Sequence, residues 1–113
     1  MDASRMPTRL IVNADDYGLT PEVSRGIREA HLRGIVTSTT CMMNLPATAD
    51  EIAKALVQTP QLGLGVHLVL TAGRPISRPD TIPSLCTEDG RFYKLDPLQN
   101  RLTTIDPADV ERE

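Results

Sequence analysis

Aromatic residues are scarce in this chain, at 3 % of 113 residues with no tryptophan. A packed core must therefore rest on leucine, isoleucine, valine, alanine and methionine. No apolar run approaches the roughly 18 residues that cross a membrane, and the N-terminus lacks the apolar region of a secretory signal peptide. Lysine and arginine do not cluster, and the net charge is −3. These absences argue against a membrane span and against nucleic acid as a partner.

Cysteine is also rare. The two cysteines, Cys41 and Cys86, form neither a C-x-x-C motif nor a disulfide framework. Reduced thiols are typical of the cytoplasm, so we expect a cytoplasmic protein. A hydrophobic content of 40 % over 113 residues indicates a globular chain with one small domain and a modest core.

The most informative feature is the acidic pair Asp15-Asp16, which follows directly on the apolar run of residues 9–14. A short continuous apolar run predicts a strand that is covered on both faces. Two adjacent carboxylates at the end of such a strand are costly to desolvate and repel each other. Their position favours a site that uses a cation or a proton transfer; the alternative is a solvated turn that caps a helix.

Local signals predict an alternation of strands and helices after this pair. Thr20 is a candidate N-cap with Pro21 in the first helical position, and Gly34 is placed to end that helix. Residues 36–43 are rich in β-branched types and predict a second strand. Cys41 and the methionines of this segment are expected to fill the core.

The segment after the second predicted strand again predicts a helix followed by a strand. Thr48 as N-cap and Glu51 three residues later predict a capping box for a second helix. Residues 62–70 predict a third strand. Two strand–helix–strand units in a row imply an α/β fold with a parallel sheet and right-handed crossovers.

The remainder of the chain has a different character. Three prolines interrupt the segment beyond the third strand, and we interpret residues 71–93 as a long loop region. Asp106-Pro107 resembles a helix start with few residues after it. Three parallel strands cannot close a barrel and leave a sheet edge exposed. We therefore expect residues 1–113 to form a single incomplete domain, the N-terminal part of a longer protein, whose exposed edge favours association as a homodimer.

His67 lies within the predicted third strand, with small residues near it on the same face. The carboxyl ends of parallel strands carry the reactive groups of α/β proteins, so His67 and the acidic pair are candidates for one site. One carboxylate could ligate a cation while the other acts as a base. Histidine with aspartate suits Zn²⁺ or another divalent ion, but a catalytic site needs about three protein ligands. Alternatively, His67 is a core histidine that is satisfied by the backbone.

Several segments together resemble the YdjC-like carbohydrate deacetylases, which include chitooligosaccharide and hopanoid-biosynthesis-associated deacetylases. The resemblance covers nearly the whole chain in register. The segments that carry it are Leu10-Ile11-Val12-Asn13-Ala14-Asp15-Asp16-Tyr17-Gly18-Leu19, Gly34-Ile35-Val36-Thr37-Ser38-Thr39-Thr40, Met42-Met43-Asn44-Leu45-Pro46-Ala47, Gly63-Leu64-Gly65-Val66-His67-Leu68, Ile82-Pro83-Ser84-Leu85 and Asp89-Gly90-Arg91-Phe92.

This resemblance implies the N-terminal portion of a (β/α)-barrel-like fold and a hydrolase that removes N-acetyl groups from amino sugars with a divalent metal ion, Mg²⁺ or Zn²⁺. It implies Asp15 as the general base, and Asp16 and His67 as metal ligands. Asn44 lies in a matching segment, and the resemblance leaves its role open. A further metal histidine lies downstream of the matching segments in the family. The substrate implied is an acetylated amino sugar or oligosaccharide.

Two other classes of function remain open at this point. A phospho-receiver domain also carries an acidic pair after its first strand, but it needs an aspartate at the end of the third strand. Residues 62–71 contain no aspartate. The other alternative is a non-catalytic fragment that binds metal or sugar.

Overall fold

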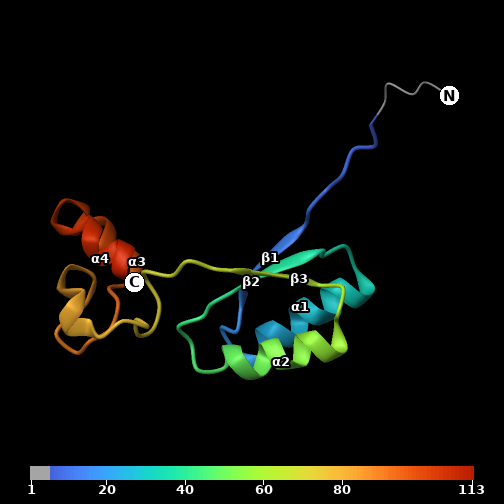
Figure 1. The fold of residues 1–113 in the computed structure, drawn as a ribbon, viewed down its shortest axis with the longest axis horizontal. Helices are drawn as coiled ribbons and strands as arrows, with labels where there is room; N and C mark the ends of the chain where they lie inside the picture. Colours follow the sequence, from blue (N-terminus) through green and yellow to red (C-terminus); the bar gives the residue numbers. More distant parts are fainter. Residues whose placement is uncertain (1–5) are drawn as a thin grey trace.

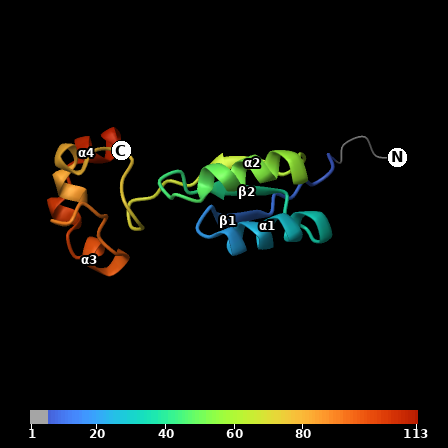
Figure 2. The ribbon, with the colours of Figure 1, turned by 90° about the horizontal axis from the view of Figure 1, so that it is seen from below.

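Three parallel strands and two helices make up the first part of the fold in the computed structural model, which describes residues 6–113. The strands are β1 (Asn13–Tyr17), β2 (Ser38–Cys41) and β3 (Gly63–Val66), in the sheet order β1-β2-β3. Helices α1 (Pro21–Arg33) and α2 (Thr48–Gln58) connect them. Figures 1 and 2 show both helices on the same face of the sheet. The predicted α/β class, with parallel strands and alternating helices as in part of a barrel, is confirmed.

The start of α1 follows the predicted local signals. The Thr20 hydroxyl oxygen accepts a hydrogen bond from the Val23 amide at 3.1 Å, and Pro21 is the first helical residue. The helix ends at Arg33, directly before Gly34. Because capping depends on neighbours along the chain, the sequence alone was sufficient here.

The predicted capping box of α2 is wrong. Ala47 is the N-cap residue and makes no side-chain cap. The Thr48 hydroxyl instead donates to the Met42 carbonyl at 2.5 Å, and Glu51 is buried against Arg28. Both side chains have partners that lie outside the helix, and these partners replace the reciprocal cap.

The prediction of a strand over residues 9–14, covered on both faces, is also wrong. Strand β1 begins at Asn13, and the side chains of Leu10 and Ile11 are each 77 % exposed. Figure 1 shows the chain before β1 extending away from both the sheet and the two helices. The apolar residues therefore lack a covering layer among residues 6–113, and the acidic pair lies inside β1 rather than after it.

The other two strands are shorter than predicted. Strand β2 covers only residues 38–41 of the predicted 36–43, and β3 covers residues 63–66 of 62–70. Cys41 and Met42 are buried as expected, but Met43 is 48 % exposed, so its assignment to the core is wrong. Beyond the strand ends the cover is incomplete, since Leu68 after β3 is 88 % exposed.

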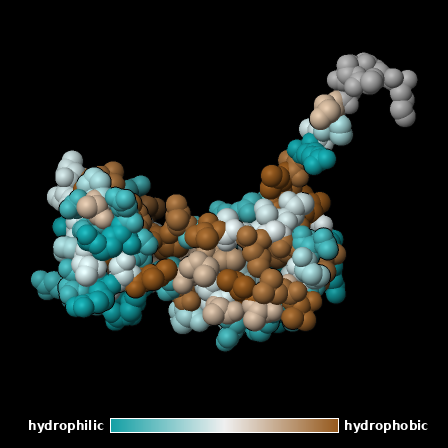
Figure 3. Space-filling model, in the orientation of Figure 1, coloured by the Kyte–Doolittle hydropathy of each residue, from teal (hydrophilic) through white to brown (hydrophobic). Residues whose placement is uncertain are grey.

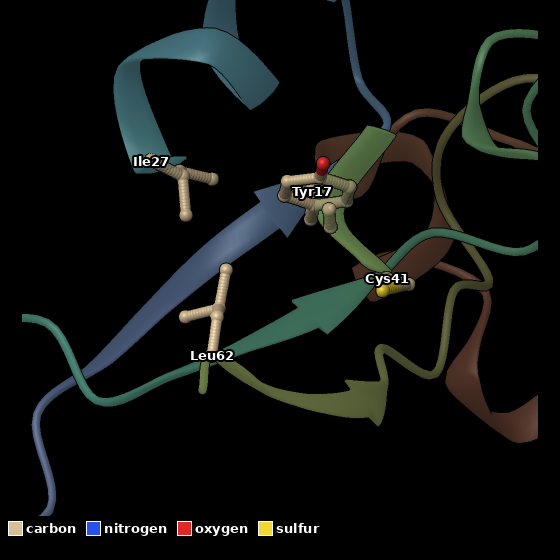
Figure 4. Packing of buried hydrophobic residues seen from close by; sticks show 5 residues of the cluster. Tyr17, Ile27, Cys41 and Leu62 are labelled. Carbon is tan, nitrogen blue, oxygen red and sulfur yellow. The ribbon is translucent and has the colours of Figure 1, made fainter. Parts of the chain in front are cut away.

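The core between the sheet and the helices is small. Tyr17, Ile27, Cys41 and Leu62 converge there, together with Ala55 (Figure 4). Alternate residues of β2 point into it, so Thr39 and Cys41 are buried. No helix covers the opposite face of the sheet in Figures 1 and 2.

A buried ion pair joins the two helices. Arg28 Nη1 of α1 lies 2.5 Å from Glu51 Oε2 of α2, and Arg28 also donates to the Tyr17 hydroxyl at 2.9 Å. Tyr17 in turn donates to the Glu51 carbonyl at 2.5 Å. Burial opposes ionisation of Glu51, but hydrogen bonds from Lys54 and Arg28 outweigh it and lower the pKa of this carboxyl. The charges are therefore mutually satisfied inside the protein.

The remaining residues form a second lobe of short helices. These are η1 (Pro79–Thr81), η2 (Pro83–Leu85), α3 (Leu95–Gln99), η3 (Leu102–Thr104) and α4 (Pro107–Arg112). A separate apolar cluster of Ile82, Leu85, Cys86 and Phe92 holds the lobe together. Figure 3 shows apolar surface along the segment that joins the two lobes. Within residues 6–113, every helix is too short or too polar to span a bilayer.

The end of the second lobe is fixed by carboxylates. Asp106 caps α4 as predicted, accepting from the Ala108 amide at 2.9 Å. The Asp109 carboxylate accepts from the amide and the hydroxyl of Ser84, at 2.9 and 2.6 Å. A short helix is not stable by itself, and these contacts anchor α4 to η2.

We expect Glu51→Gln to lower the free energy of unfolding by about 3–5 kcal/mol, because it leaves the Arg28 charge buried without a counterion. Glu29→Gln is the matched control: it removes the exposed pair with Arg33 and should cost less than about 1 kcal/mol. Urea unfolding followed by circular dichroism measures both. Equal costs for the two variants would contradict a stabilising role of the buried pair.

Candidate active site

An irregularity in β1 separates the two adjacent carboxylates. Ala14 pairs with Thr39 and Tyr17 with Cys41, so β1 contains one residue more than β2 over this interval. Asp16 accommodates this extra residue in the backbone, since its φ of +70° lies in the left-handed region. This bulge allows the two aspartates to face different partners.

Asp16 lies beside His67. The Asp16 amide and its Oδ1 are each 3.4 Å from His67 Nδ1. The His67 amide donates to the Cys41 carbonyl at 2.9 Å, which extends the β2–β3 pairing by one residue and fixes the backbone there. The His67 side chain is 28 % exposed and therefore half-buried, with its Nδ1 facing the backbone amide of Asp16. The structure thus brings Asp16 and His67 together.

The chemistry of this pair suits a divalent cation. Two ligands of one tetrahedral ion, with bonds of about 2.0–2.1 Å, lie roughly 3.4 Å apart, which is the separation found between the Asp16 and His67 atoms. Among residues 6–113, no third histidine, cysteine, aspartate or glutamate joins them. The described residues therefore fit two positions of a ligand set.

Asp15 points to the face of the sheet that the helices leave open. Its Oδ1 accepts from Asn13 Nδ2 at 2.9 Å and faces the Thr40 hydroxyl at 3.4 Å. Ser38 donates to Asn13 Oδ1 at 2.8 Å and orients that amide. The contacts of Ser38 and Thr40 cross from β2 to β1. Asp15 therefore lies in a strand, rather than in the capping turn that was the alternative.

A cavity of about 170 Å³ opens beside His67. Apolar side chains make up most of its wall, and Asn44, His67 and Glu113 are its polar members. Glu113 accepts from the amides of Ile76 and Ser77, at 2.7 and 2.8 Å, so α4 and the segment after β3 close this cavity together. Sequence reasoning missed Glu113, because no local pattern signals a contact between residues so far apart in the chain.

Asn44 occupies a position between this cavity and a larger one. Its Nδ2 donates to the carbonyls of Ala72 and Arg74, at 2.7 and 3.0 Å. Its Oδ1 is buried and has no hydrogen-bond partner among the described residues. A buried acceptor without a donor is unusual in proteins, and this one belongs to a residue that lines both cavities.

The backbone at Asp16 generates a prediction that is independent of chemistry. We expect Asp16→Asn to leave the free energy of unfolding nearly unchanged, because asparagine tolerates positive φ. Asp16→Val should cost about 1–3 kcal/mol, because a β-branched residue is strained there. Urea unfolding of the two variants tests this. If valine is tolerated as well as asparagine, the bulge does not constrain this position.

Known proteins resemble this chain over most of its length. Residues 9–113 match the family model described as YdjC-like protein. Relatives named carbohydrate deacetylase are 44% identical in Brevibacillus brevis, over 93% of this chain and 40% of that protein, and 44% identical in Geobacillus stearothermophilus, over 96% and 41%. A solved structure from Enterococcus faecalis, whose name refers to cellobiose-phosphate cleavage, superposes with a TM-score of 0.85 at 39% identity, over 91% of this chain and 39% of that one.

The chain thus spans about 40% of the length of these curated relatives. This family match contradicts the alternative of a phospho-receiver domain. On the match over residues 9–113, this chain belongs to the YdjC-like protein family.

Proposed function

We propose that this chain supplies part of the active site of a metal-dependent carbohydrate deacetylase, which hydrolyses the N-acetyl group of amino sugars of the chitooligosaccharide type. The observation that carries the proposal is the convergence of Asp16 and His67, 3.4 Å apart, with Asp15 on the adjoining open face of the sheet. The name shared by the curated relatives supports the same reaction. A cytoplasmic location and a homodimer stay predictions.

Asp16 and His67 would hold the metal, either Zn²⁺ or Mg²⁺. A divalent ion in such a site polarises an acyl carbonyl and lowers the pKa of a bound water. The residues of this chain have the complementary task of holding the ligands and accepting a proton.

Asp15 is the candidate general base. Its contacts with Asn13 and Thr40 both involve Oδ1, and none of the described residues donates to Oδ2. That oxygen can take a proton from the water whose oxygen bonds to the acetyl carbon. The sugar nitrogen then takes up a proton from a general acid as the C–N bond breaks, which releases acetate and the free amine. The hydroxyls of Ser38 and Thr40 and the amide of Asn13 keep the carboxylate in one orientation.

A binding module without turnover is the second candidate. It is favoured by the presence of only two candidate metal ligands among residues 6–113. Such a module would bind the ion or the sugar without releasing acetate. The two candidates differ in turnover and agree on the metal site, so they require separate measurements.

Metal binding is the first measurement. After chelator treatment, titration with Zn²⁺ against a chromophoric competitor should give an affinity that Asp16→Asn and His67→Ala each weaken by about tenfold or more, since loss of a supporting contact alone costs 10- to 100-fold. His31→Ala is the matched control, because it also removes a histidine. His31 lies on α1, where its Nδ1 is 2.7 Å from the Val36 carbonyl, and it contacts neither Asp16 nor His67. Unchanged affinity in His67→Ala would refute the proposed ligand.

Acetate release is the second measurement. With Zn²⁺ or Mg²⁺ and diacetylchitobiose, in the 113-residue chain and in any longer polypeptide that contains it, Asp15→Asn should lower turnover by about 100-fold or more. Its metal affinity should stay unchanged. Asp50→Asn, on the exposed first turn of α2, is the control. Wild-type turnover in Asp15→Asn would exclude Asp15 as the base, and metal binding without any acetate release would favour the binding module.

A further inference from the structure

A third cavity, of about 180 Å³, opens on the first lobe. It shares no residue with the two cavities that Asn44 lines, and neither Asp16 nor His67 borders it. Figures 1 and 2 show α1 and α2 side by side on one face of the sheet, and both helices contribute to its wall. We call this the helix cavity; its wall is formed by Pro21, Glu22, Arg25 and Arg28 of α1 and Lys54 of α2.

Positive charge is in excess around the helix cavity. Its wall contains three basic side chains and one acidic side chain, that of Glu22. Behind the wall, the Glu51 carboxylate pairs with Arg28 at 2.5 Å and with Lys54 at 2.7 Å. Arg25 and Glu22 are exposed, and neither makes an ion pair within residues 6–113. With Glu51 included, three positive charges face two negative ones, and an unpaired guanidinium is left on the surface of α1.

Arg28 distinguishes this cavity from a solvated groove. Its side chain is only 7 % exposed, and its Nη1 donates to the Tyr17 hydroxyl and to the Glu51 carboxylate. No residue within 6–113 accepts a hydrogen bond from its Nε or Nη2. Neither atom is sealed from water, because Asn44 Oδ1 is the one fully buried polar side-chain atom of these residues that lacks a partner. Arg28 lines the helix cavity, so the cavity gives a deeply buried guanidinium access to an acceptor.

The start of α1 adds a further attraction for an anion. Pro21 and Glu22, the first two residues of this 13-residue helix, lie in the wall. No residue within 6–113 accepts a hydrogen bond from the Glu22 amide. Free amides and the helix dipole give this end of a helix a partial positive charge. Arg25 and Arg28 follow Pro21 at the spacing of one helix face, so the dipole and both guanidinium groups act on the same side of α1.

We propose that the helix cavity binds a phosphate group, with Arg28 beneath it and with Arg25 and Lys54 on either side. A phosphate group carries a charge of about −1.5 to −2 at neutral pH and offers several acceptor oxygens, which suit the planar fork of an arginine. It would bind the Arg28 donors that Glu51 leaves unused, so the buried ion pair is kept. A metal cation or a neutral sugar would leave the excess positive charge unmatched.

The size of the helix cavity agrees with this ligand. Its volume of about 180 Å³ is more than ten times the roughly 10–15 Å³ that one water molecule requires, which leaves room for a tetrahedral anion. The site does not depend on the proposed deacetylase reaction, because it contains none of the candidate metal ligands and does not border the His67 cavity.

The test is titration of the 113-residue chain with inorganic phosphate and with glycerol 3-phosphate, followed by NMR at an ionic strength held constant with sodium chloride. We expect saturable shifts of the Arg25 and Arg28 Nε–H resonances and of the Glu22 amide resonance. Arg25→Gln with Lys54→Gln should weaken the affinity at least tenfold, because it removes two charge-assisted contacts. This double variant keeps the Arg28–Glu51 pair, and circular dichroism checks that it is folded. Should it unfold, Arg25→Gln alone, on the exposed surface of α1, should still weaken the affinity measurably.

The matched control is Arg33→Gln with Lys94→Gln, which removes the same two types of side chain away from the cavity and should leave the affinity within twofold. Tighter binding of glycerol 3-phosphate than of inorganic phosphate would support the site with an organic phosphate as its ligand. Equal or tighter binding of inorganic phosphate would support it with the phosphate group alone as its ligand. Shifts that do not saturate with either ligand, or equal weakening by the cavity variants and the control, would overturn the proposal.

Discussion

The buried pair of Arg28 and Glu51 is the interaction on which the first lobe depends. The core contains few large apolar side chains, so much of the cohesion between α1 and α2 must come from polar contacts. Tyr17 joins this pair through its hydroxyl, which donates a hydrogen bond to the Glu51 carbonyl and accepts one from Arg28. Tyr17 directly follows Asp16, so the contact between the helices fixes the end of the strand that carries the acidic pair.

This connection explains why a strained backbone at Asp16 can persist. Left-handed φ at a residue other than glycine is kept only when its surroundings determine it. On one side, Tyr17 is fully buried and hydrogen-bonded within the core. On the other, Asn13 and Ala14 are paired with β2. The extra residue between these fixed points has to bulge, and the bulge turns the Asp16 carboxylate toward His67 while Asp15 faces the open side of the sheet.

Sequence reasoning predicted what depends on neighbouring residues. The Thr20 cap, the Asp106 cap and the parallel order of strands are local or topological features, and each is confirmed. The capping box at Glu51 was wrong because Arg28, 23 residues away, is the stronger partner. The strand over residues 9–14 was wrong because apolarity does not reveal whether a covering layer is present.

The same distinction applies to the candidate site. The pairing of Asp16 with His67 followed from the rule that carboxyl ends of parallel strands meet at one edge. Arg74 and Arg91, which line one cavity, carried no signal, because contacts between distant segments bring them together, among them the hydrogen bonds from Phe92 to Gly73 and from Arg74 to Asp89. Sequence patterns therefore find functional residues on regular elements more readily than those on loops.

The open face of the sheet relates these parts to one another. Its residues are polar or lack a side chain, with Asn13 and Asp15 on β1, Ser38 and Thr40 on β2, and Gly63 and Gly65 on β3. Such a face provides hydrogen bonds close to the backbone and leaves room above β3, and the sugar ring of the proposed substrate would use both. The second lobe adds the apolar and cationic walls that the sheet lacks. In the proposed deacetylase, recognition of the sugar would therefore draw on both lobes, which Asn44 links through its hydrogen bonds to the carbonyls of Ala72 and Arg74.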